Sequence, residues 1–155
     1  ESGEEKFPVT GVTWKEAIKY AQSVGKRLPT EEEWEKAARG DDGREYPWGN
    51  TFDKSKCNSG ESANAVLREV GSYREGASPY GCMDMAGNAF EWTRSWYQAY
   101  PGNQEINAKY GQVFRVLRGG SYQSSEFDVR CARRHYDSVD ADRTDYGFRC
   151  ALDVQ

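Results

Sequence analysis

The sequence is poor in histidine, in closely spaced cysteines and in long apolar runs. A single histidine, His135, cannot by itself supply a histidine-rich iron site. The four cysteines (Cys57, Cys82, Cys131 and Cys150) form no CxxC pair, which disfavours a zinc ribbon. No apolar stretch is long enough to predict a membrane span.

The chain also lacks an excess of positive charge. Lysine and arginine number 21 and aspartate and glutamate 25, which gives a net charge of −4. This balance disfavours a general nucleic-acid binder, so we expect no nucleic-acid partner. Aromatic residues make up 14% of the chain, which argues against disorder. We therefore expect one folded domain over residues 1–155.

Two helices are predicted in the first forty residues, and each begins at a capping box. Thr-x-x-Glu motifs at residues 13–16 and 30–33 pair a threonine hydroxyl with a backbone amide, while the glutamate reaches back. Apolar residues then recur at helical spacing behind each motif. Gly25 and Gly40 provide the expected stops.

No amphipathic helix is visible beyond Gly40, where glycine, asparagine, aspartate, serine and aromatic residues dominate. The candidate strands are short: Val113–Leu117, Ser121–Gln123, Val129–Ala132 and Gly147–Leu152. A compact domain with so much loop needs extra devices to hold it. Aromatic packing, an arginine–carboxylate network and a metal ion are the candidates.

Arginine replaces lysine in the C-terminal part of the chain. Between Arg115 and Arg149 there are seven arginines, six acidic residues and no lysine. Arginine forms planar, bidentate pairs with carboxylates and tolerates burial. We therefore expect several of these arginines to be structural, although a solvated charged surface is the simpler alternative.

Seven ordered segments together resemble one family, the formylglycine-generating enzyme (sulfatase-modifying factor) domain. The segments are Pro8–Trp14, Gly25–Glu31, Glu33–Gly40, Tyr46–Asn50, Gly81–Thr93, Arg118–Tyr122 and Gly147–Cys150. The resemblance implies an α+β, C-type-lectin-like fold with two helices, a small antiparallel sheet and extensive irregular loops.

The residues that carry the family's oxidation chemistry are missing here. The family enzyme oxidises a substrate cysteine with a copper-binding cysteine pair that follows its GGSY-type motif. In this sequence Ser124 stands where the first cysteine is expected, and the segment is too short for the second. Since a hydroxyl cannot replace a soft thiolate ligand for Cu(I), we expect neither copper nor formylglycine generation. In the simplest interpretation, Ser124 and Ser125 are ordinary polar loop residues.

The resemblance also bears on the cysteines. Cys131 and Cys150 match cysteines that pair with helix cysteines in the vertebrate enzyme, but Ala21 and Ala38 occupy those helix positions here. Buried free thiols are the simpler expectation, and they favour a reducing compartment. A bridge between Cys57 and Cys82, or between Cys131 and Cys150, stays open as an alternative.

The resemblance further implies a calcium site. By position, its ligands would be the side chains of Asp84 and Glu91 and the carbonyls of Gly87 and Ala89. Oxygen ligands of this kind suit Ca²⁺. In the alternative interpretation, Asn88 and Glu91 brace a turn through hydrogen bonds.

The stretch 115–150 resembles the variable segment of proteins diversified by retroelements, many of which contain this domain. Adenine-directed mutation of asparagine codons cannot produce Lys, Glu, Gln, Met or Trp, and none of the five occurs in residues 127–152. Tyrosine, serine and short polar residues are also typical of paratopes. The candidate ligand-binding residues are Gln123, Ser124, Ser125, Phe127, Asp128, His135, Tyr136, Asp137, Ser138, Asp140, Thr144, Asp145 and Tyr146.

Three hypotheses for function follow. The favoured one is a non-catalytic domain that binds a macromolecule, a protein by preference, through a hypervariable surface. The second is a structural or accessory domain of a larger protein, such as a bacterial kinase. The third is an oxidoreductase relative with different chemistry, which would need a partner domain because this chain has one histidine.

Overall fold

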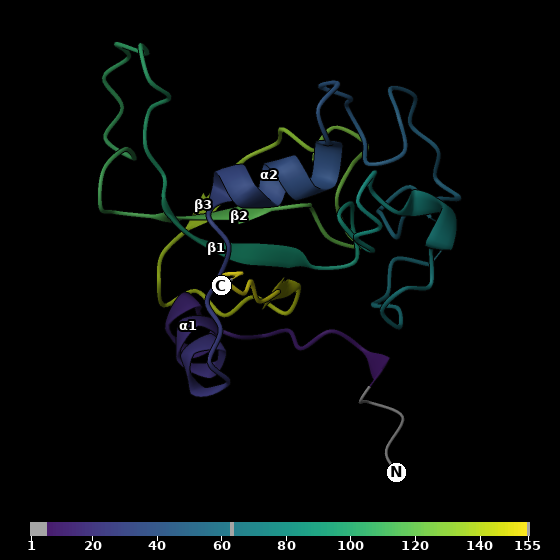
Figure 1. Cartoon of the computed structure of the whole chain (residues 1–155), viewed down its shortest axis with the longest axis horizontal. Coiled ribbons are helices and arrows are strands. Elements are labelled where there is room, and N and C mark those ends of the chain that lie inside the picture. The colour runs from purple at the N-terminus through teal and green to yellow at the C-terminus, as the bar shows by residue number, and fades with distance from the viewer. Residues whose placement is uncertain (1–5, 63, 155) are drawn as a thin grey trace.

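The computed structural model describes residues 6–62 and 64–154. Two α-helices precede a four-stranded sheet, and long irregular segments connect the strands (Figure 1). The helices are α1 (Trp14–Ser23) and α2 (Glu31–Arg39), followed by a 3₁₀ turn, η2 (Arg74–Gly76). The strands are β1 (Phe90–Trp96), β2 (Arg115–Arg118), β3 (His135–Asp137) and β4 (Tyr146–Phe148). This architecture confirms the expected α+β, C-type-lectin-like fold.

Both predicted capping boxes are present. The hydroxyl of Thr13 accepts from the amide of Glu16, and Thr30 accepts in the same way from Glu33. In each box the glutamate side chain accepts from the threonine amide, at 2.9 Å. Three acidic residues in the first turn of α2 suit the positive end of the helix dipole. The capping boxes therefore set where both helices begin.

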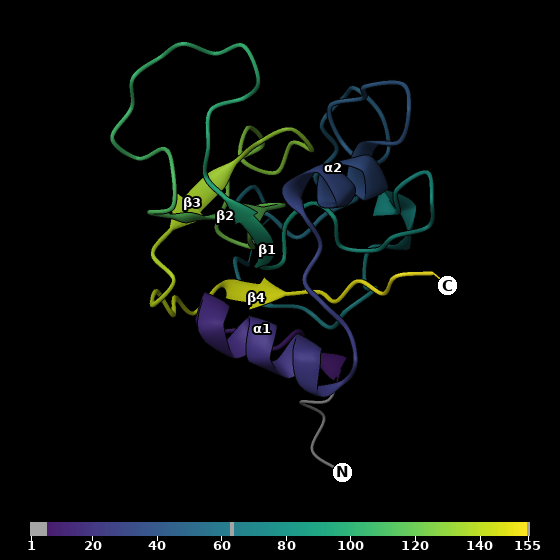
Figure 2. The ribbon, with the colours of Figure 1, turned by 60° about the vertical axis from the view of Figure 1, so that its left-hand side comes forward.

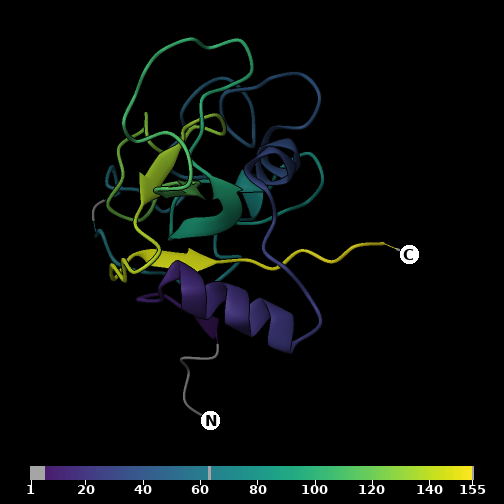
Figure 3. The ribbon, with the colours of Figure 1, turned by 90° about the vertical axis from the view of Figure 1, so that its left-hand side faces the viewer.

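The sheet has the order β3-β2-β1-β4 and is mixed. The pairs β1–β2 and β2–β3 are antiparallel, whereas β1 and β4 run parallel, which corrects the expectation of a wholly antiparallel sheet. The parallel pair arises because the chain crosses from β3 at one edge to β4 at the other. Figures 2 and 3 show α1 beside β4, and α2 on the other side of β1.

Two predicted strands are turns instead. Residues 121–123 and 129–132 contain no strand, because their amides bond to loop partners: the amide of Cys131, for example, donates to the carbonyl of Glu45 at 2.8 Å. The sequence prediction also missed β1. Three successive residues of that strand, Glu91 to Thr93, are buried, so it shows no alternation of apolar and polar residues.

The core combines apolar clusters with buried ion pairs. One cluster joins α1 to the sheet through Ala17, Ala21, Trp92, Leu117 and Tyr146.

The four cysteines are free thiols, and burial raises the pKa of Cys57 to about 11 and that of Cys131 to about 12. This confirms the expectation of free thiols over disulfide bridges, but only Cys57 and Cys131 are buried, while Cys82 and Cys150 are partly exposed.

The arginine network is also confirmed. Arg118 is fully buried and pairs with Glu31 at 3.4 Å and with Glu35 at 2.6 Å. The Arg118 guanidinium also donates to the carbonyl of Cys131 at 2.6 Å. These contacts tie α2 to β2 and to the irregular segment after β2.

None of the helices in the described part of the chain is long and apolar enough to span a membrane.

Candidate functional site

A cavity of about 790 Å³ lies where the side chains of β3 and β4 meet. Its lining comes from six separate stretches of the chain: Phe90, Tyr97, Phe114, Gln123, Arg133, Arg134, His135, Tyr136, Asp137, Arg143, Asp145 and Tyr146. We call it the ligand cavity. The curled sheet brings β3 and β4, which are opposite edge strands, close enough for their side chains to hydrogen bond.

A hydrogen-bonded triad forms part of the cavity wall. The Tyr146 hydroxyl donates to Asp137 at 2.9 Å and lies 2.8 Å from Nε2 of His135. Since the tyrosine has one proton and gives it to the carboxylate, Nε2 of His135 carries the proton shared with the tyrosine oxygen. Arg143 donates to the same Asp137 oxygen at 3.1 Å. The triad therefore fixes the orientation of three of the predicted ligand-binding side chains.

The environment keeps these groups in one charge state at neutral pH. Burial lowers the pKa of His135 below its usual 6.5, so the ring is neutral. Burial, and then the hydrogen bond to Asp137, raise the pKa of Tyr146. Burial would raise the pKa of Asp137, but the Ser138 amide, Tyr146 and Arg143 hold it below its ordinary value. The triad therefore presents one carboxylate and two neutral groups, none of them activated as a nucleophile.

An aromatic wall faces the triad. Tyr136 stacks on Tyr97 with ring centroids 4.2 Å apart and packs against Phe114 at 5.4 Å. On the other side Phe90 lies 4.8 Å from the His135 ring. Rigid, amphipathic rings of this kind supply contact area at low entropic cost. The cavity therefore offers flat apolar surface beside polar groups.

The structure gathers some of the thirteen predicted binding residues and separates the rest. Those that line the cavity are Gln123, His135, Tyr136, Asp137, Asp145 and Tyr146. The others lie outside it: Ser124, Ser125, Phe127, Asp128, Ser138, Asp140 and Thr144. Among these, Asp140 forms an exposed ion pair with Lys15 at 2.6 Å.

Six lining residues were not predicted. They are Phe90, Tyr97, Phe114, Arg133, Arg134 and Arg143. Tyr97 and Phe114 belong to the long segment between β1 and β2, where only the abundance of tyrosine could have suggested a role. The three arginines lie within the predicted variable stretch, where several arginines were expected to be structural, and none of the three was among the predicted binding residues.

The position of the oxidase cysteine is structural here. Ser124 is buried, and its hydroxyl accepts from the amide of Ser121 at 2.8 Å. Its neighbour Ser125 donates to Asp128 at 3.0 Å. Both hydroxyls therefore hold the turn after β2 in shape, and Ser124 is not presented to the ligand cavity.

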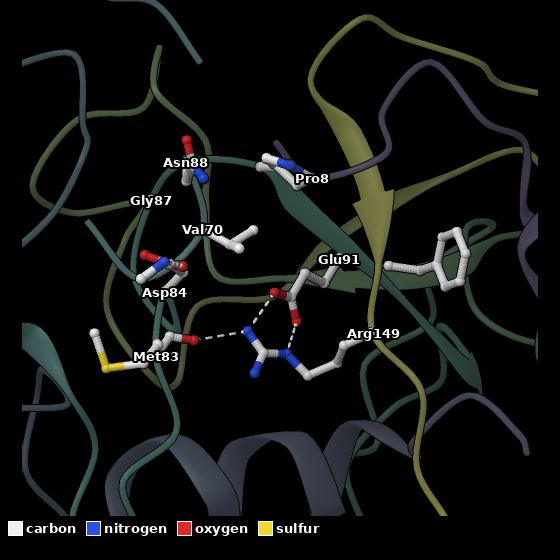
Figure 4. Close-up of a pocket in the computed structure, with 11 residues that line it drawn as sticks. Pro8, Val70, Met83, Asp84, Gly87, Asn88, Glu91 and Arg149 are labelled. Carbon is white, nitrogen blue, oxygen red and sulfur yellow. Dashed lines mark hydrogen bonds and ion pairs between the residues drawn. The ribbon is translucent and has the colours of Figure 1, made fainter. Parts of the chain in front are cut away.

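The predicted calcium residues line a second cavity, of about 410 Å³ (Figure 4). Both carboxylate oxygens of Glu91 accept from Arg149, each at 2.6 Å, and one also accepts from the Trp34 indole at 2.6 Å. Asp84 accepts from the amide of Gly71 at 2.7 Å. Burial raises the pKa of Asp84, an effect that the Gly71 amide and Arg149 oppose.

This arrangement does not fit a calcium ion. The positive charge of the Arg149 guanidinium already neutralises the Glu91 carboxylate. The carbonyl of Gly87 already accepts a hydrogen bond from the amide of Ala89 at 3.0 Å. A cation would have to displace Arg149 from Glu91. No group of three or more His, Cys, Asp or Glu side chains in the described residues could hold a metal. Calcium binding at Asp84, Gly87, Ala89 and Glu91 stays a prediction that the geometry does not favour.

Nearly the whole chain matches a known family. Residues 1–154 match the sulfatase-modifying factor enzyme 1-like domain. The chain belongs to this family. The expectation drawn from its seven motif segments is thereby confirmed.

The relatives differ in size and in name. Serine/threonine-protein kinase pkn1 of Chlamydia caviae is 47% identical over 162 residues, which cover 100% of this chain and 25% of the kinase. The inactive C-alpha-formylglycine-generating enzyme 2 of Bos taurus is 39% identical over 94% of this chain and 50% of its own length. The chain thus spans only a quarter to a half of these relatives.

A solved structure shares the fold. Treponema denticola variable protein 1 superposes with a TM-score of 0.79 at 23% identity, over 96% of this chain and 72% of that protein. At this identity the likeness shows the fold alone. It confirms the expected likeness between this domain and a variable protein.

Proposed function

We propose that this domain is a non-catalytic ligand-binding module that binds a protein through the ligand cavity. The observation that carries the proposal is the convergence of six predicted binding residues, from three parts of the sequence, on one cavity. Stacked tyrosines beside arginines have the composition of a protein-binding hot spot. Loops held on a rigid sheet are also where binding residues usually lie.

Three observations support a non-catalytic role. Ser124 replaces the oxidase cysteine, and its hydroxyl is engaged in the turn after β2. Burial raises the pKa of the Cys131 thiol to about 12, which keeps that group protonated and unreactive. One relative, from Bos taurus, is itself named as inactive.

Diversification by a retroelement is the finer form of this proposal. Tyr136 is partly exposed and Arg143 is exposed, so substitutions at these positions would cost little folding free energy. Tyr146, in contrast, is 1% exposed and holds the triad together. Population sequencing of the locus tests this form. Adenine-directed variation within about residues 122–146, sparing Tyr146, would support it. A uniform segment with no reverse transcriptase gene nearby would contradict it.

Peptide selection tests the binding proposal itself. Peptides selected against the 155-residue chain from an unbiased display library should lose at least about tenfold in affinity on Tyr136→Ala, as for a hot-spot residue. The control is Tyr80→Ala, which removes a more exposed tyrosine ring outside the ligand cavity. The proposal would be contradicted if Tyr136→Ala left the affinity of the selected peptides unchanged and the peptides bound outside the ligand cavity.

An accessory role inside a larger protein is the second candidate. The match to a quarter of the Chlamydia caviae kinase favours it. In a full-length protein that contains this domain, deletion of the domain would then impair activity while Tyr136→Ala would not. If Tyr136→Ala impairs activity as much as deletion does, ligand binding is the role of the domain.

A further inference from the structure

A further cavity, of about 450 Å³, adjoins the ligand cavity. The two share three lining residues, Tyr97, Arg133 and Arg134, so they lie side by side. We call the second part the arginine cavity. None of the predicted binding residues lines it, and the proposed function above does not require it.

The lining of the arginine cavity is strongly unbalanced in charge. Four arginines face it, against one carboxylate, that of Glu45. This excess of positive charge lies on a chain whose net charge is −4. The imbalance therefore belongs to the cavity and does not reflect the overall composition.

The ion pairs behind the cavity leave part of this charge uncompensated. Three arginines share two carboxylates: Arg39, Arg118 and Arg134 pair with Glu31 and Glu35. The group therefore carries one net positive charge. All of its members are at least half-buried, so the charge is less screened than on an open surface. A field of this sign attracts anionic groups into the cavity.

Two further arginines have donors to spare. Arg130 forms no ion pair with any described residue, and its one side-chain hydrogen bond among these residues runs from Nε to the carbonyl of Phe127 at 3.1 Å. Arg133 pairs with Asp128 through Nε at 2.8 Å, and its side chain is 49% exposed. The terminal guanidinium nitrogens of both residues donate to no acceptor in the described part of the chain. These nitrogens have the fork geometry that suits a carboxylate.

Tyrosines frame the same cavity. The Arg134 guanidinium lies 4.5 Å from the ring centroids of both Tyr97 and Tyr100, and Tyr110 packs on Tyr97 at 5.3 Å. Arg134 donates to Glu31 and to the carbonyl of Gln98, so it is held in place. The cavity therefore combines a hydrogen-bonded arginine among tyrosine rings with two arginines, Arg130 and Arg133, that keep unused donors.

We propose that the arginine cavity binds the carboxylate side chains of an acidic peptide segment in the partner protein. The inference rests on the proposed function, because the ligand cavity would hold neighbouring residues of the same segment. Arg130 and Arg133 take the carboxylates, and the uncompensated charge behind them adds long-range attraction. An extended peptide suits the site because the two cavities lie side by side and share Tyr97, Arg133 and Arg134.

Fluorescence anisotropy with defined peptides tests the proposal on the 155-residue chain. The probe is a fluorescein-labelled decapeptide of alternating glutamate and glycine, and its control has glutamine in place of glutamate. The glutamate peptide should bind at least about tenfold more tightly, and raising the salt from about 50 to 300 mM should weaken it. Arg130→Gln and Arg133→Gln should each weaken it about three- to tenfold. Arg74→Gln is the matched control and should leave binding unchanged, since Arg74 in η2 is exposed and pairs with no carboxylate of the described residues.

Each other result overturns the inference. Equal affinity for the two peptides would contradict the acidic-peptide site. So would an unchanged affinity of the glutamate peptide for the double variant Arg130→Gln/Arg133→Gln. Binding of polyphosphate or DNA but not of the peptide assigns the cavity to a different class of anion. If selected peptides depend on Tyr136 but not on Arg130, the ligand cavity stands and this inference fails. If no selected peptide depends on Tyr136, the proposed function itself fails.

Discussion

The ion pair between Arg149 and Glu91 gives the most quantitative prediction. Glu91 is 8% exposed and receives both of its guanidinium hydrogen bonds from Arg149. Arg149→Met would leave the carboxylate buried, with the Trp34 indole as its remaining partner. Breaking one side of a buried pair costs about 3–5 kcal/mol. Because the Arg149 side chain is 31% exposed, we expect the lower end, about 3 kcal/mol of unfolding free energy.

Urea unfolding followed by tryptophan fluorescence measures this cost. The double variant Glu91→Gln/Arg149→Met should lose less than Arg149→Met alone, since a neutral amide still accepts from Trp34 and no charge is stranded. Lys15→Met is the control: its pair with Asp140 is more than 60% exposed on both sides and should cost no more than about 0.5 kcal/mol. A loss below about 1 kcal/mol in Arg149→Met, or additive losses in the double variant, would show that Glu91 and Arg149 are not energetically coupled.

Four smaller predictions follow from the same structure. Thr30→Ala removes the cap of α2 and should cost about 1 kcal/mol in urea unfolding; no change would show that the cap is dispensable. Tyr146→Phe keeps the ring but breaks the triad and should cost about 1–2 kcal/mol by the same assay, against a loss near zero if the triad is loose. Burial lowers the pKa of His135 in the folded protein, so on acidification the unfolded chain binds a proton at His135 before the folded chain does. The free energy of unfolding is therefore highest above about pH 6.5, the unfolded pKa, and falls as the pH drops from there toward the lower pKa of the folded state. His135→Gln should flatten that slope between pH 7.5 and 5.5, and an unchanged slope would assign it to other groups. Calcium at about 1 mM should not raise the melting temperature of the wild type above that in EDTA, since Arg149 occupies Glu91; a clear rise would support the calcium site.

The sequence predicted the elements whose determinants are local. A capping box fixes a helix start with four residues, so residues 13–16 and 30–33 were sufficient for α1 and α2. The strands depend on distant partners. Residues 129–132 have a buried valine and cysteine, as a strand would, but the amide of Cys131 bonds to the loop carbonyl of Glu45. Neither propensity nor periodicity reveals such a partner.

The candidate site was predictable in part for the same reason. The polar run containing His135, Tyr136 and Asp137 could be recognised from its composition. Its meeting with Tyr146 depends on the curl of the sheet, and the contribution of Tyr97 depends on the path of the segment between β1 and β2. The excess of arginine was visible in the sequence. Only the three-dimensional structure shows which arginines pair with carboxylates and which keep unused donors, as Arg130 does.

The most direct test of the central claim is the effect of Tyr136→Ala on the affinity of selected peptide ligands, measured beside Tyr80→Ala. We expect a loss of at least about tenfold for Tyr136→Ala and none for Tyr80→Ala, since Tyr136 stacks on Tyr97 in the ligand cavity while Tyr80 lies outside it. Equal affinities for the wild type and Tyr136→Ala would contradict the claim that this cavity binds the ligand.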